Sequence, residues 1–213
     1  MNFDLQTLIL ILPPVLLALT FHEFMHGYAA YKFGDNTAKN MGRLTFNPLA
    51  HLDPIGTLMI ILVRFGWAKP VPVNPYNLRN PRQDMVIISA AGPAANLALG
   101  LISGLLLRFI RTGALAALPQ SIVNPVYLMV YFSLQINIAL AFFNLIPIPP
   151  LDGSKILRGV IPREQEHIVD WLEHYGGFIL MGLILSSYIT GFSVIGMFLR
   201  PFILFFSRLF GGV

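Results

Sequence analysis

The sequence contains no cysteine and few charged residues. Without cysteine, the chain forms neither a disulfide bond nor a thiolate ligand for a metal ion. Of its 213 residues only 11% are charged and 55% are hydrophobic, whereas a typical soluble domain is roughly 25% charged. This composition argues against an ordinary soluble globular domain and predicts that a lipid bilayer surrounds much of the chain.

Positive charge is in modest excess, with a formal net charge of +4. In a chain this apolar, the excess indicates cytoplasmic loops of a multi-pass protein of the cell membrane rather than nucleic-acid binding. We therefore expect residues 34–83 and 152–175 on the cytoplasmic side, and the N-terminus and residues 109–125 outside. The cations of the first stretch are Lys39, Arg43, Arg64, Lys69, Arg79 and Arg82.

Long apolar runs predict membrane-spanning helices. Three core helices are expected at about residues 5–33, 84–108 and 126–145, and C-terminal helices at about 176–210, because each run approaches or exceeds the roughly 20 residues that cross a bilayer. The last third is predicted to end in an interfacial helix or to break near residues 186–191. The sequence thus predicts a single membrane-embedded domain over residues 1–213, an all-α polytopic protein with about four to six transmembrane helices.

Residues 34–83 differ from the rest because glycine and proline interrupt them. Within this stretch "TLMIILVRFGWA" is apolar but too short to span a membrane. We expect a small, membrane-associated, β-rich or re-entrant segment between the first and second core helices. Such backbone is tolerated at membrane depth only against protein or a wet cavity, so the segment is predicted to cover a cavity.

The first apolar helix contains "FHEFMH", which places His22 and His26 one turn apart on one helical face, with Glu23 beside them. This is the HExxH arrangement, in which two histidines bind zinc and the glutamate is a general base. A lone buried histidine is more often a core residue that has found a partner. Three ionisable groups in one apolar helix are costly and indicate a functional site.

Catalytic zinc needs a third protein ligand and an open position for water. Asp152 is the candidate, because it follows the prolines of "NLIPIPPLDG" that end the third core helix. These place it at the same membrane margin as the two histidines. The alternative is that Asp152 caps a short helix that starts at Ser154.

Five stretches together resemble the site-2 protease family of intramembrane zinc metalloproteases, in the short prokaryotic form without a PDZ or CBS domain. They are "FHEFMHGYAA", "NPLAHLDPIG", "KPVPVNP", "AGPAAN" and "NLIPIPPLDG", and the resemblance covers about residues 10–160.

The resemblance implies that His22, His26 and Asp152 bind one zinc ion per chain and that Glu23 is the catalytic base. It implies hydrolysis of peptide bonds in or near the transmembrane segments of membrane-protein substrates. It also implies a small sheet after the first core helix, on whose edge a substrate could pair as an added strand.

Supporting residues are expected among the polar side chains of the apolar helices. Asn96, Asn137 and Asn144 could hydrogen-bond between helices, while the resemblance favours Asn144 near the substrate. The small residues of "AGPAAN" allow close backbone approach. His51 and Asp53 are predicted either to support the metal ligands or to form a turn.

A competing interpretation is a zinc-binding membrane protein that does not cleave, such as a transporter or a scaffold. Transporters usually spread ionisable ligands along a path through several helices. Here the ionisable groups gather at one level, and Glu23 favours hydrolysis.

Overall fold

The computed structural model describes residues 5–63 and 66–213. Arg64 and the N-terminal residues 1–4, on which two expectations rested, lie outside this part. Short 3-10 and π turns join its helices. The helices are α1 (Leu5–Lys32), α2 (Thr37–Asn40), α3 (Pro54–Val63), α4 (Pro81–Phe109), α5 (Gln120–Asn144), α6 (Asp152–Val160), α7 (Glu166–Thr190) and α8 (Val194–Gly211).

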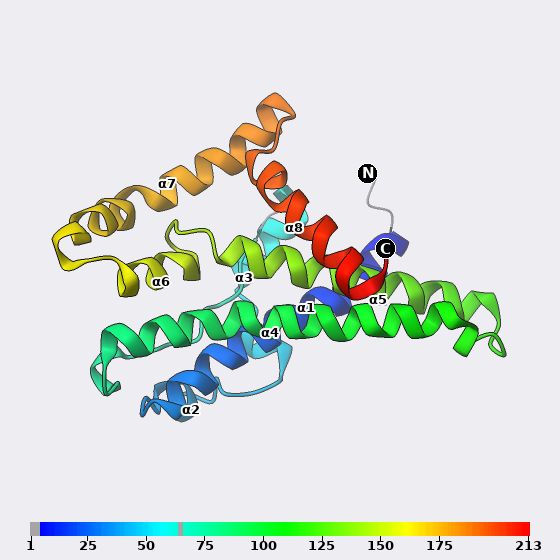
Figure 1. The fold of residues 1–213 in the computed structure, drawn as a ribbon, viewed down its shortest axis with the longest axis horizontal. Coiled ribbons are helices and arrows are strands. Elements are labelled where there is room, and N and C mark those ends of the chain that lie inside the picture. The colour runs from blue at the N-terminus through cyan, green and yellow to red at the C-terminus, as the bar shows by residue number, and fades with distance from the viewer. Residues whose placement is uncertain (1–4, 64–65) are drawn as a thin grey trace.

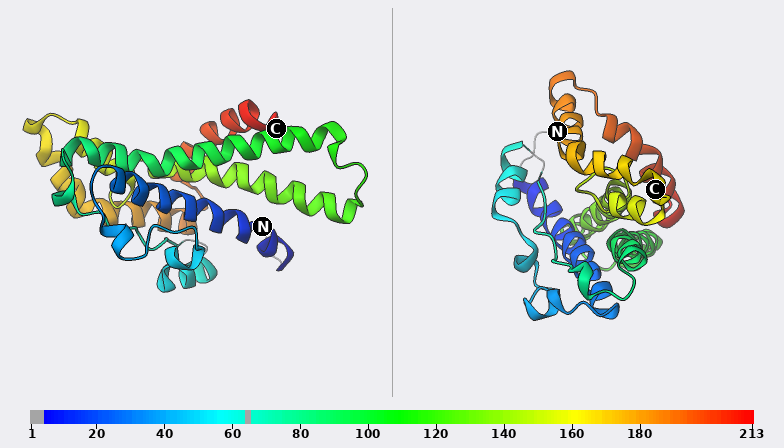
Figure 2. Two further views of the ribbon diagram at one scale, coloured as in Figure 1. Left: turned by 90° about the horizontal axis from the view of Figure 1, so that it is seen from below. Right: turned by 90° about the vertical axis from the view of Figure 1, so that its left-hand side faces the viewer.

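Helix α4 is the centre of the structure, because it contacts α1, α5, α6 and α8. Figure 1 shows α4 and α5 running antiparallel along most of the molecule's length. Figure 2 shows α1 on one side of this hairpin and α8 on the other. Leu107 of α4 is fully buried against Leu134 and Ile138 of α5. This apolar interface holds the hairpin together.

Helix α8 runs antiparallel along α5. The ring of Phe202 stacks on Phe142 with centroids 4.3 Å apart, and Gln135 Nε2 donates to Ser207 Oγ at 2.8 Å. At the far end, Arg108 Nη2 donates to the carbonyl oxygen of Leu209 at 2.7 Å. A cation at a helix C-terminus satisfies carbonyls that have no partner within the helix.

Five helical segments are long and apolar enough to cross a membrane: Gln6–Lys32, Pro81–Ala114, Gln120–Asn144, Arg163–Thr190 and Val194–Gly211. Large apolar side chains also face outward, such as Phe178 at 78% and Ile189 at 84% exposure. Lipid is the solvent in which such a surface is stable. The prediction of an all-α multi-pass membrane protein is therefore confirmed.

Of the two alternatives for the last third of the chain, the structure shows the break near residues 186–191. Helix α7 ends at Gly191, whose φ of 71° is left-handed and whose N–H bonds to the carbonyl of Ser187. Helix α8 then starts with Ser193, whose Oγ accepts the N–H of Gly196 at 2.9 Å. The start of α7 differs from the expectation, because its helix includes the charged residues from Glu166 onward.

The β-rich segment predicted within residues 34–83 is wrong. The described residues contain no strand, and residues 34–83 show a single bridge between Leu52 and Ala68. Residues 54–63 form helix α3 instead: Pro54 occupies its first position, and Asp53 Oδ1 accepts the N–H of Gly56 at 2.7 Å. Without a sheet, pairing of a substrate on its edge loses its structural basis.

Asp35 holds the connection between α1 and α4 together. Its carboxylate is fully buried and accepts hydrogen bonds from the N–H and hydroxyl of Thr37, the N–H of Asn74 and the side-chain amide of Asn77. Burial raises the pKa of Asp35, but these hydrogen bonds outweigh it, so its pKa lies below the ordinary 3.8. One carboxylate thus ties α2 to the segment before α4.

We expect Asp35→Asn to lower the free energy of unfolding by about 2–3 kcal/mol at pH 7, because an amide nitrogen would face buried donors. A depressed native pKa contributes stability above the unfolded value and loses it as the pH falls below that value. The difference in stability between the two proteins should therefore shrink as the pH falls below about 4 and through the lower native pKa of Asp35. Denaturant unfolding in detergent micelles at pH 7 and pH 3 measures this.

The matched control is Asp170→Asn. Asp170 is exposed and pairs with Arg158 on the surface, so its loss should cost less than about 1 kcal/mol. Equal stability of wild type and Asp35→Asn at pH 7 would contradict the role given to Asp35.

Candidate metal centre and active site

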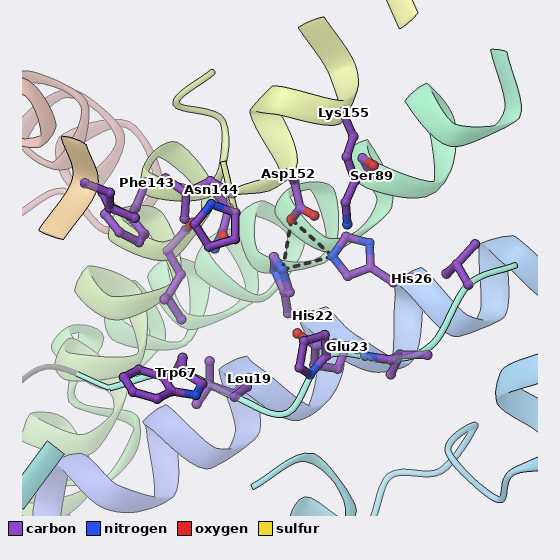
Figure 3. Close-up of a pocket in the computed structure, with 18 of the residues that line it drawn as sticks. Leu19, His22, Glu23, His26, Trp67, Ser89, Phe143, Asn144, Asp152 and Lys155 are labelled. Carbon is purple, nitrogen blue, oxygen red and sulfur yellow. Dashed lines mark hydrogen bonds and ion pairs between the residues drawn. The ribbon is translucent and has the colours of Figure 1, made fainter. Parts of the chain in front are cut away.

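Three side chains from two distant helices meet at one point in the structure (Figure 3). His22 and His26 come from adjacent turns of α1, and Asp152 is the first residue of α6. His22 Nε2 and His26 Nε2 are 3.0 Å apart, and each lies 3.1 Å from Asp152 Oδ2. All three residues are buried. Asp152 makes no side-chain cap for α6, so the capping alternative is not what the structure shows.

Hydrogen bonds on the far side of each ring fix which nitrogen carries the proton. His26 Nδ1 lies 2.7 Å from the carbonyl oxygen of Ile88, which can only accept. His22 Nδ1 lies 2.6 Å from Asn96 Oδ1. Both Nδ1 atoms are therefore donors, and in the neutral rings both Nε2 lone pairs point at the carboxylate oxygen of Asp152.

A chain of amides keeps Asn96 in the orientation that this requires. Asn96 Nδ2 donates to the carbonyl of Ala18 at 3.1 Å and to Asn137 Oδ1 at 2.9 Å. Asn137 Nδ2 in turn donates to the carbonyl of Ser133 at 2.9 Å. Both asparagines are fully buried. The backbone carbonyls of α1 and α5 thus orient Asn96 and Asn137, and Asn96 in turn fixes the orientation of the His22 ring.

The meeting point has the chemistry of a cation site. Two imidazole lone pairs and a carboxylate oxygen within 3.1 Å repel one another unless a positive charge lies among them. Their separations are close to the ~3.3 Å edges of a tetrahedron with zinc bonds of about 2.0–2.1 Å. The three groups therefore fit a zinc ion with one further position open.

Glycines make room for the two imidazoles and for the turn that carries Asp152. A Cβ on Gly92 of α4 would lie 2.4 Å from His26 Nε2 and 2.7 Å from His22 Cε1. A Cβ on Gly153 would lie 2.3 Å from the carbonyl oxygen of Leu145 and 2.4 Å from that of Ile146. The "AGPAAN" stretch needs glycine because the two imidazoles pack against Gly92. The "LDG" stretch needs glycine because the residues after α5 pack against Gly153.

Glu23, His22, His26 and Asp152 line the same cavity, whose volume is about 420 Å³. Glu23 Oε2 accepts the N–H of Val71 at 2.8 Å, so the segment before α4 holds the carboxylate. Asn144 lines the same cavity and donates to the carbonyl of Leu140 at 3.0 Å. The cavity walls come from α1, α4, α5, α6, α7 and the segment 66–73, so part of the stretch that was expected to cover a cavity does line it. Most lining side chains are apolar.

His51 and Asp53 lie apart from this cavity. His51 Nε2 is bonded to the carbonyl of Thr45 at 2.9 Å, and the buried Nδ1 finds no partner in the described part of the chain. Asp53 caps α3 by accepting the N–H of Gly56, so it begins a helix instead of forming the expected turn. Neither residue is among those that line the cavity.

Two polar residues that line the cavity, Ser89 and Lys155, were not predicted from the sequence as site residues. Ser89, Gly92 and Asn96 follow one another at helical spacing on the buried face of α4. Lys155 follows Asp152 by three residues, which places it on the same face of α6. Helical spacing from residues already singled out was the signal that could have found both.

We expect Gly92→Ala to weaken zinc binding by at least about tenfold, because the added methyl group must displace the two imidazoles. Gly182→Ala is the matched control, since a Cβ at this α7 position meets no atom within 4 Å. Zinc titration of the purified proteins measures both. Wild-type affinity in Gly92→Ala would show that the imidazoles do not pack on α4 as described.

Asn96→Ala should leave the fold intact and weaken zinc binding by about 10–100-fold, because His22 loses the acceptor that orients it. The loss should appear in zinc titrations, and in proton NMR as a lost or exchanging His22 Nδ1–H signal. An unchanged signal together with unchanged affinity would show that Asn96 does not orient the ring.

Comparison with known proteins identifies the family. Residues 110–184 match peptidase family M50. The chain is 41% identical over 180 residues to "Putative zinc metalloprotease YwhC" of Bacillus subtilis, which covers 82% of this chain and 81% of that protein. It is 29% identical over 157 residues to "Putative zinc metalloprotease MJ0611" of Methanocaldococcus jannaschii, covering 74% and 73%. No solved structure gave a significant match.

A further relative, "Putative zinc metalloprotease Rip2" of Mycolicibacterium smegmatis, is 27% identical over 187 residues, covering 84% of this chain and 67% of that protein. The names of these relatives and the group of His22, His26 and Asp152 indicate the same cofactor, which is zinc. The resemblance drawn from the sequence motifs is confirmed: this chain belongs to peptidase family M50, the site-2 protease family.

Proposed function

We propose that the protein is an intramembrane zinc metalloprotease of the site-2 protease type. It hydrolyses peptide bonds in or near the transmembrane segments of other membrane proteins. The observation that carries the proposal is the position of Glu23. Its carboxylate adjoins the His22, His26 and Asp152 group on a cavity within helices that are apolar enough to cross a membrane.

In this proposal His22, His26 and Asp152 hold one zinc ion. When bound, zinc supplies the Lewis acidity that activates a water molecule and polarises a peptide carbonyl. The protein supplies ligands whose orientation is set in advance by Ile88 and Asn96. Such preorganisation of ligands by outer hydrogen bonds commonly tunes metal sites.

Glu23 acts as the general base and then as the general acid. The N–H of Val71 occupies Oε2, and Oε1 has no hydrogen-bond partner among the described residues. This oxygen takes a proton from the attacking water and later delivers it to the leaving amine. Asn144 uses one amide hydrogen on Leu140, and its second is donated to the oxyanion that develops on the carbonyl.

The cavity favours a substrate segment with apolar side chains. A transmembrane helix hides its carbonyl groups in hydrogen bonds, so it must unwind locally before attack. Apolar side chains such as Leu140, Phe143 and Leu180 line the cavity and would receive apolar substrate side chains. Water enters from the end near α6, which lies outside the five candidate spans. By the distribution of cations this end faces the cytoplasm.

The test measures zinc content and cleavage of a transmembrane peptide by purified wild type, Glu23→Gln and Asp152→Ala. We expect about one zinc per wild-type chain. Glu23→Gln should keep the metal and lose cleavage by a factor of about 10²–10⁴. Asp152→Ala should lose metal and cleavage together.

Glu173→Gln is the matched control. It makes the same substitution of glutamine for glutamate, but at a surface residue that pairs with Arg158. It should cleave like wild type. If Glu23→Gln retained zinc and cleaved the peptide at the wild-type rate, the proposed mechanism would be wrong. Zinc binding without any cleavage by wild type would favour a transporter or scaffold.

A further inference from the structure

Among the described residues, Lys155 is the one cation that lines the cavity, and no hydrogen bond or ion pair engages it there. Lys155 lies on α6 three residues after Asp152, and its side chain lines the same cavity. Figure 3 shows this side chain extending from α6, beside Asp152, toward His26 in that view. Lys155 is also exposed, which places it where the cavity meets solvent.

Neither acidic residue that lines the cavity forms an ion pair with Lys155 in the described part of the chain. Asp152 faces the two imidazoles, and Glu23 accepts the N–H of Val71. No hydrogen bond or ion pair engages the Lys155 ammonium within the described residues, and no other lysine or arginine is among those lining the cavity. An ammonium at the edge of an apolar cavity attracts an anion more strongly than one in open water.

The remaining walls select the rest of the ligand. Phe143 of α5 and Leu180, Met181 and Ile184 of α7 are apolar and line the cavity beyond the metal centre. A complementary ligand is therefore apolar along most of its length and negative at the end that lies toward α6.

We propose that Lys155 is a specificity-determining residue that favours substrates with an Asp or Glu side chain next to the apolar segment, at its α6 end. The inference rests on the proposed proteolytic function. The carboxylate of the substrate pairs with the ammonium while the adjoining apolar residues fill the cavity. An anionic lipid headgroup has the same charge, but Lys155 shares its cavity with His22 and Glu23, where a substrate must bind.

The experiment uses three transmembrane peptides that carry Glu, Gln or Lys at one position flanking the apolar segment. The comparison is repeated at successive positions on both sides of that segment. Binding to the full-length Glu23→Gln protein is read by fluorescence anisotropy in zwitterionic micelles, and cleavage by wild type is read as kcat/KM. We expect Glu to be favoured over Gln by about two- to fivefold on one side only. Lys155→Glu should reverse this order, so that Lys is favoured.

Arg163→Glu is the matched control. It makes the same change of charge in the turn before α7, outside the cavity lining, and should keep the preference for Glu. A preference for Glu that survives Lys155→Glu overturns the inference, as does the absence of any preference in wild type.

A further arm adds anionic lipid to the micelles. One outcome is that anionic lipid changes binding or kcat/KM for all three peptides equally, and that Lys155→Glu abolishes this change. This result would assign the Lys155 ammonium to a lipid headgroup and overturn the substrate assignment. The binding assay needs no turnover. If wild type cleaves nothing, the proposed function fails while the binding order still decides the role of Lys155.

Discussion

Two imidazole nitrogens and a carboxylate oxygen face one another within 3.1 Å inside the helix bundle. These groups repel one another in an apolar interior, so they stay together only if a cation lies among them and the surrounding structure orients them. Much of the architecture serves this one convergence. The prolines after α5 end that helix where Asp152 must turn inward, and glycines at 92 and 153 let the backbones approach.

Helix α4 performs most of the orienting although it contributes none of the three groups. Its Ile88 carbonyl and Asn96 amide hold the two imidazoles, and Gly92 lies between them. At its first turn Arg82 donates to the carbonyls of Gly159, Arg158 and Ile161 at the end of α6. The helix that carries Asp152 is therefore fixed to the same scaffold as the histidines.

Local chemistry in the sequence predicted most of this site. The spacing of His22 and His26 identifies one helical face, and polar residues such as Asn96 and Asn137 in apolar helices need partners, which the structure supplies. Helix α3 could not be predicted in this way, because a short apolar run has no period that separates a buried helix from a strand. The role of Asp35 depends on which segments meet in three dimensions, and no local pattern contains that information. Lys155 could have been found, because it follows Asp152 by three residues on the same helix.

The separation of the ligands along the chain sets an order of events during synthesis. His26 and Asp152 are 126 residues apart, and α4 and α5 lie between them. A nascent chain must therefore insert α1, α4 and α5 before the carboxylate can join the two histidines. Each imidazole in α1 lacks its acceptor until α4 is inserted, and it lacks the carboxylate until α6 emerges. The growing polypeptide consequently carries an incomplete metal site until its third long apolar helix has been inserted and α6 has emerged.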